Sequence, residues 1–128
     1  MKDLLDFLDK YNIAYTVDGD SVIAGDIHLE NRGITTLPES IGNLKCDTLY
    51  LRRNKLTSLP ESIGNLKCAY LDLRDNKLAS LPETIGNLKC ETLAISKNNL
   101  TSLPESIGNL KCAYLYLENN NLTSLPES

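Results

Sequence analysis

The sequence predicts an α/β repeat solenoid, with a short parallel β-sheet on the concave face and short helical or 3-10 turns on the convex face. Three spacings predict this fold class. The five prolines recur every 22 residues, the four cysteines recur at the same interval, and so do the glycines Gly42, Gly64, Gly86 and Gly108. A fixed period of about 20 to 50 residues is typical of stacked repeats. Leu dominates the hydrophobic residues and Trp is absent, as expected when one core position is used many times.

The N-terminal segment departs from the repeat and predicts a cap over residues 1–23. Leu4, Leu5 and Leu8 share one face of a helix, for which Asp3 is the expected N-cap. The Asp-Gly turn signal at residues 18–19 lies between two β-prone segments and predicts a hairpin. Helix and hairpin together would cover the first coil of the solenoid, and a helix that binds a partner is the alternative.

The solenoid is expected over residues 24–128, with repeats that begin at positions 24, 46, 68, 90 and 112 and a last repeat that is incomplete. In each unit, the pattern Leu49-Tyr50-Leu51 alternates with period two and predicts a short strand with both leucines turned inward. A short helical turn follows further along. Pro60 suits its first position, and Gly64 suits a left-handed exit from it.

The unit that begins at Cys46 reads Cys-x-x-Leu-x-Leu-x-x-Asn-x-Leu. It resembles the leucine-rich repeat family of bacterial or phage type, with Cys in the position of the first Leu. The resemblance covers about residues 22–128. It implies that one asparagine per coil points inward and bonds the loop backbone, in a ladder of Asn54, Asn76, Asn98 and Asn120. Arg32 takes the equivalent position of the first repeat, so we expect that rung to be absent.

The cysteines Cys46, Cys68, Cys90 and Cys112 are expected to form a second structural ladder in the core. Four thiolates in a line cannot surround one zinc ion tetrahedrally. Parallel side chains on neighbouring coils keep their Cβ atoms about 4.8 Å apart, beyond the roughly 3.5–4.5 Å of a disulfide. A metal or redox site is the alternative to this interpretation.

Composition and charge exclude several functions. The net charge is −4, whereas nucleic-acid binders and anionic-membrane binders need a basic excess. No apolar run approaches the roughly 18 residues of a membrane span, and the acidic start is unlike a signal peptide. His28 is the only histidine, and no nucleophile–base pair accompanies it. We therefore expect a cytoplasmic protein without catalytic activity, cofactor, metal, nucleic acid or membrane partner.

The strand positions that point away from the core vary from coil to coil, whereas the turns repeat almost unchanged. Known leucine-rich repeat proteins mostly bind other proteins through this concave surface, and the resemblance implies the same here. Tyr and Arg are enriched at binding hot spots. The candidate partner-binding residues are His28, Tyr50, Arg52, Arg53, Tyr70, Asp72, Arg74, Tyr114 and Tyr116. Copying of strand tyrosines by duplication, without a binding role, is the alternative.

The C-terminal end shows no polar closing segment, in contrast to the N-terminal end. A structural unit that self-associates into a homo-oligomer through this end is therefore a second hypothesis, and the recognition part of a larger effector is a third. The sequence favours a protein-binding module over both, and it does not identify the partner.

Overall fold

The computed structural model describes residues 1–123, and the expected end of the fifth repeat, 124–128, lies outside the described residues. Five short strands form one parallel sheet in the order β3-β5-β6-β7-β8. Each strand pairs with the next at an offset of 22 residues. Their bounds are β3 (Asp26–His28), β5 (Thr48–Tyr50), β6 (Tyr70–Asp72), β7 (Thr92–Ala94) and β8 (Tyr114–Tyr116). The predicted α/β repeat solenoid is confirmed.

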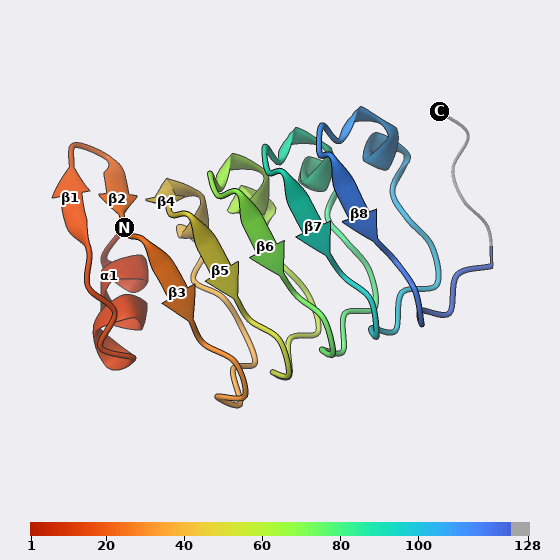
Figure 1. Ribbon diagram of the computed structural model, residues 1–128, viewed down its shortest axis with the longest axis horizontal. Coiled ribbons are helices and arrows are strands. Elements are labelled where there is room, and N and C mark those ends of the chain that lie inside the picture. The colour runs from red at the N-terminus through yellow and green to blue at the C-terminus, as the bar shows by residue number, and fades with distance from the viewer. Residues whose placement is uncertain (124–128) are drawn as a thin grey trace.

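The side of the coils opposite the sheet, here called the turn side, carries one short 3-10 helix in each of the first four coils (Figure 1). Leucines of the strands and isoleucines of these helices, such as Leu49, Leu71, Ile63 and Ile85, meet in the core at 1% exposure or less. The four 3-10 helices are η1 (Ile41–Asn43), η2 (Glu61–Asn65), η3 (Glu83–Asn87) and η4 (Glu105–Asn109). Each coil alone is too thin to bury these side chains, so the core exists only because coils stack.

The N-terminal cap consists of α1 (Lys2–Lys10) and a hairpin of β1 (Thr16–Asp18) and β2 (Ser21–Ile23). Strand β2 also pairs in parallel with β4 (Leu44–Lys45), and this pairing connects the hairpin to the end of the first coil. Leu4 and Leu8 of α1 are fully buried. Among the described residues, no helix has the length and apolar character needed to cross a membrane.

Asp3 has a different role from the one expected. The helix begins at Lys2 with Met1 as its N-cap, so Asp3 lies in the first turn. Its carboxylate accepts hydrogen bonds from the hydroxyl and the backbone N–H of Ser40. The bond from the Ser40 hydroxyl is the main reason why the pKa of Asp3 is lowered. Asp3 therefore fastens the cap helix to the first coil.

The expected left-handed exit at Gly64 is also wrong. Gly19 and Gly33 are the glycines with positive φ among the described residues, and Gly64 is not one of them. A Cβ atom added at Gly64 would lie 2.3 Å from the carbonyl oxygen of Thr84 in the next coil. Glycine is needed here because the turns of adjacent coils approach closely, which the sequence pattern alone does not reveal.

Candidate functional site

The strands place two rows of side chains on the sheet surface that points away from the core, here called the outer sheet face. Strand residues alternate between the core and this face. The first row contains Asp26, Thr48, Tyr70, Thr92 and Tyr114, in register along the sheet. The second contains His28, Tyr50, Asp72, Ala94 and Tyr116. Because every strand has the same register, residues far apart in sequence become neighbours on one continuous surface.

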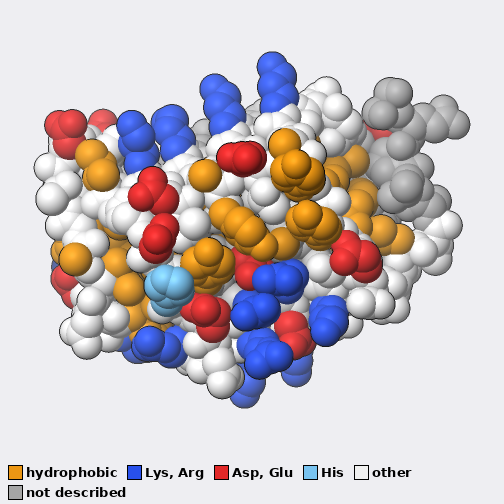
Figure 2. Space-filling view, viewed as in Figure 1, with side chains coloured by type: hydrophobic (Ala, Val, Ile, Leu, Met, Phe, Trp, Pro, Cys, Tyr) orange, Lys and Arg blue, Asp and Glu red, His pale blue; other side chains and the backbone are white. Residues whose placement is uncertain are grey.

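Three rings of neighbouring coils form an aromatic strip, defined as His28, Tyr50 and Tyr70. The rings of His28 and Tyr50 stack at a centroid distance of 4.9 Å, and those of Tyr50 and Tyr70 lie 5.7 Å apart. Figure 2 shows hydrophobic side chains gathered along the middle of this face, beside the single histidine. Burial, followed by the nearby charge of Asp72, raises the pKa of Tyr70.

A second aromatic pair lies at β8. The rings of Tyr114 and Tyr116 stack with centroids 6.5 Å apart. At 55% and 42% exposure, these two residues are exposed, whereas Tyr50 and Tyr70 are half-buried. Rigid rings that already contact one another lose little conformational entropy on binding. The outer sheet face therefore offers apolar area at both ends of the sheet.

Asp72 lies on this face by register, but it is not accessible. Its side chain is 1% exposed. Its two carboxylate oxygens accept hydrogen bonds of 2.9 Å from Nε and Nη2 of Arg74. This pairing raises the pKa of the Arg74 guanidinium. Asp72, which the sequence predicts as a binding residue, therefore holds Arg74 in place and offers no contact surface of its own.

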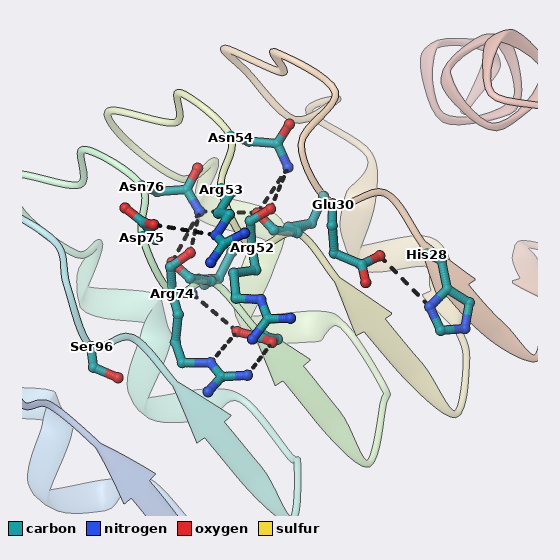
Figure 3. Close-up of polar contacts among 12 residues, drawn as sticks. His28, Glu30, Arg52, Arg53, Asn54, Arg74, Asp75, Asn76 and Ser96 are labelled. Atoms are coloured by element: carbon teal, nitrogen blue, oxygen red, sulfur yellow. Dashed lines mark hydrogen bonds and ion pairs between the residues drawn. The ribbon is translucent and has the colours of Figure 1, made fainter.

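Below the aromatic residues lies a basic hollow of about 160 Å³, defined by its lining of Arg52, Arg53, Arg74, Asp75, Ser96, Lys97, Glu118 and Asn119. Figure 3 shows that Arg52, Arg53 and Arg74 come from two neighbouring coils and lie close together. Arg53 Nε is 3.7 Å from a carboxylate oxygen of Asp75. The structure thus groups the three predicted arginines and adds Lys97, Glu118 and Ser96 to them.

The loop after each strand has an unusual backbone conformation that sequence reasoning missed. Asn31, Arg53, Asp75, Lys97 and Asn119 all adopt a positive φ of 56–62°. Asn and Asp tolerate this left-handed region better than other non-glycine residues. Their presence at positions 31, 75 and 119 is the signal that predicts the turn. Arg53 and Lys97 take the same conformation without that advantage.

The asparagines lie behind this loop and bond the backbone of two coils. Asn76 Nδ2 donates to the carbonyls of Leu51 and Leu73 at 3.0 Å. Its Oδ1 accepts from the backbone N–H of Leu56 at 3.1 Å. Asn54, Asn98 and Asn120 make the equivalent bonds in their own coils. These side chains satisfy buried backbone groups.

Arg32 stands where an asparagine ladder residue would lie in the first coil. Its backbone N–H donates to Oδ1 of Asn54. Its guanidinium carbon lies 5.8 Å from the ring centroid of Tyr11 in the cap. The first coil therefore has no inward asparagine side chain at this position, and its arginine contacts the cap instead.

All four cysteines are free thiols. A hydrogen bond with Cys46, together with burial, raises the pKa of Cys68 far above its usual range. Burial raises the pKa of Cys90 to about 12 and also raises that of the half-buried Cys112. A raised pKa lowers the thiolate fraction and with it the reactivity of the thiol.

His28 has one acidic neighbour on the same face. Its Nδ1 lies 3.6 Å from Oε1 of Glu30 (Figure 3). Within residues 1–123, no three histidine, cysteine, aspartate or glutamate side chains gather as a metal-binding group.

A larger groove of about 800 Å³ lies on the turn side. Its walls are the same four-residue sequence, Gly-Asn-Leu-Lys, from three successive coils, at residues 64–67, 86–89 and 108–111. This groove follows from the stacking of identical turns, so its size does not make it the functional site. The outer sheet face carries the more varied chemistry.

Comparison with known proteins agrees with this geometry. A family model described as Leucine Rich Repeat matches residues 45–66, 67–88 and 89–110. Among solved structures, a leucine-rich repeat protein of Leptospira interrogans is 34% identical and superimposes with a TM-score of 0.53. The match covers 80% of this chain and 33% of that one, so this chain spans about a third of the length of its structural relative. No curated protein matches the sequence.

Proposed function

The chain belongs to the leucine-rich repeat family, which generally provides protein–protein interaction modules, and from this premise we propose that it binds a protein partner through the outer sheet face. The binding residues of this proposal are His28, Tyr50, Tyr70, Arg52, Arg53, Arg74, Tyr114 and Tyr116. Asp72 acts within the protein, by orienting Arg74.

One observation carries the proposal. The turn side repeats Leu-Pro-Glu-Ser/Thr-Ile-Gly-Asn-Leu-Lys with almost no change, whereas the residues of the outer sheet face change from each coil to the next. Stacking explains why a turn position needs one residue type, but it gives no reason for the exposed His28 and the half-buried Tyr50 to differ at one register position. Interfaces are enriched in Tyr and Arg, the residues that this face combines.

The mechanism is recognition by a preformed surface. The stacked rings and the Asp72–Arg74 pair already have fixed positions, so docking immobilises few further side chains. Proteins of this family are typically non-catalytic, and we propose no reaction for this chain. We also propose that it acts in the cytoplasm.

The test compares partner capture by matched tyrosine variants. Tyr50→Ser removes a ring from the aromatic strip, whereas Tyr15→Ser removes a half-buried ring of the cap that bonds Asp9. We expect a protein captured from lysate of the source organism by the unaltered chain to be lost with Tyr50→Ser and retained with Tyr15→Ser. Circular dichroism would check that both variants fold. Equal capture by both variants would remove the basis of the proposal.

A further inference from the structure

The basic hollow contains more positive than negative charge. Four of its lining residues are cations, Arg52, Arg53, Arg74 and Lys97, and two are carboxylates, Asp75 and Glu118. Asp75 is paired with Arg53, and Arg74 is held by Asp72. Among residues 1–123, neither Arg52 nor Lys97 makes an ion pair. Within the described part of the chain, the hollow thus presents two cations without an ion-pair partner, Arg52 and Lys97, against one such carboxylate, Glu118.

The guanidinium of Arg52 is incompletely satisfied. Its Nε is buried and has no hydrogen-bond partner, whereas buried polar groups in folded proteins are nearly always hydrogen-bonded. Arginine presents a planar fork of donors that fits a carboxylate or a phosphate. An anion in the hollow would supply an acceptor for the Arg52 guanidinium.

Two of the cations are held in a strained backbone conformation. Arg53 and Lys97 have φ of 62° and 58°, at the position that carries Asn or Asp in the other three coils. Stability alone favours those residues at this position. Residues that persist in unfavourable conformations gather at functional sites. Both strained residues line the hollow, which links the strain to the charge.

From these three observations we propose that the basic hollow binds a carboxylate side chain of an acidic segment in the partner. A volume of about 160 Å³ suits a carboxylate group and not a large ligand. The aromatic strip lies beside the hollow and receives neighbouring apolar residues of the same segment. This inference rests on the proposed function and names the chemistry of the partner.

The probe is a blocked hexaglutamate peptide, with hexaglutamine as the uncharged control and inorganic phosphate as the free-anion control. NMR spectra of arginine Nε–Hε groups report binding, and the Arg52→Lys variant identifies the Arg52 signal. We expect hexaglutamate to shift the Arg52 signal saturably, in about the millimolar range, and less so as salt increases. Hexaglutamine should cause no shift, and phosphate should bind more weakly than hexaglutamate.

The decisive variant is the double replacement Arg53→Asn and Lys97→Asn. It removes two cations but places favourable residues at the strained positions, so we expect an unchanged or higher melting temperature together with at least tenfold weaker hexaglutamate binding. Lys89→Asn on the turn side is the matched control and should bind like the unaltered chain. A double variant that binds hexaglutamate normally would overturn the proposal.

The remaining outcomes separate this proposal from the proposed function. If hexaglutamate leaves Arg52 unchanged while Tyr50→Ser still abolishes partner capture, the acidic-segment proposal is wrong and the protein-binding function stands. If phosphate binds as tightly as hexaglutamate, the hollow is a site for free anions and the proposal is again wrong.

Discussion

The turn side and the outer sheet face belong to the same coils, yet one is uniform and the other varied. On the turn side, the same contact recurs between each pair of neighbouring coils: Gly42 faces Ser62, Gly64 faces Thr84 and Gly86 faces Ser106. On the outer sheet face, His28, Tyr50 and Asp72 occupy one register position with entirely different chemistry. Packing between coils therefore restricts the first region and leaves the second available for function.

The difference shows which residues carry stability and which are available for recognition. A repeated residue enters several equivalent interfaces, so its role is read from the packing of the coils. A varied residue on an exposed face has no such explanation. The exceptions are Asp72 and Ala94, which vary and are nevertheless buried. The following predictions test this division, from the largest expected effect to the smallest.

Loss of a ladder asparagine should have the largest effect on stability. Asn76→Ala leaves the buried N–H of Leu56 without a partner. It also removes one of the two side-chain bonds to each of the carbonyls of Leu51 and Leu73, which keep those from Asn54 and Asn98. An unsatisfied buried group costs about 1–3 kcal/mol and each further lost bond about 0.5–1.5 kcal/mol, so we expect a total loss of about 3 kcal/mol or more. Urea unfolding measures the loss. The control is Asn99→Ala, which replaces an exposed asparagine next to the ladder residue Asn98 and should have little effect.

The close approach of the turns should have the second largest effect. Gly64→Ala forces the backbones of two coils apart, because its Cβ would lie 2.3 Å from the Thr84 carbonyl oxygen. We expect a loss of about 2–3 kcal/mol, typical of overpacking. Gly25→Ala meets its nearest atom, a carboxylate oxygen of Asp47, at 4.0 Å and serves as the control. Equal unfolding free energies for the two variants would contradict this account of the turn side.

The outer sheet face contains one ion pair with a structural role. Arg74→Ala leaves the buried Asp72 carboxylate without its guanidinium, for which we expect a loss of about 1–2 kcal/mol, since Arg74 is partly solvated. Arg53→Ala breaks an exposed pair with Asp75 and should change the unfolding free energy by less than about 0.5 kcal/mol. Thermal unfolding of both variants measures the difference. If Arg74→Ala is as stable as Arg53→Ala, Asp72 does not depend on this pairing.

The smallest expected effect concerns reactivity and leaves stability unchanged. Cys112 is half-buried, whereas Cys46, Cys68 and Cys90 are buried. Burial raises the pKa of Cys112, so it should react with iodoacetamide more slowly than a free thiol but faster than the other three. Peptide mass spectrometry over a time course identifies the order. Early modification of Cys68 in the folded protein would show that the buried cysteines are accessible, which would contradict this prediction.

Most of the fold could be predicted from the sequence because equivalent residues of successive repeats pack against one another. The 22-residue period fixed the strand register, and the alternation around Tyr50 identified the outward positions. The role of Gly64 could not be predicted, since a left-handed turn and a close approach both favour glycine. Only the neighbouring coil distinguishes these two reasons.

The candidate site was predictable in its location but not in its internal contacts. The alternation of strand residues places Asp72 on the outer sheet face. Its burial, however, depends on the conformation of Arg74 two residues later. Arg53 and Lys97 give no sequence sign of their positive φ, because that conformation is recognisable only from the Asn and Asp of other coils. Side-chain conformation and strain depend on three-dimensional neighbours that no repeat pattern specifies.

Near-identity of the coils also creates an ambiguity in assembly that the cap resolves. Ser40, which receives the cap through Asp3, has counterparts at Ser62, Thr84 and Ser106, so these contacts alone do not distinguish one coil from another. Arg32 has no counterpart, because later coils carry asparagine there, and it is this residue that meets Tyr11 of the cap. Arg32 thus distinguishes the first coil from the later ones at the contact with the cap, and this contact fixes which coil the cap covers.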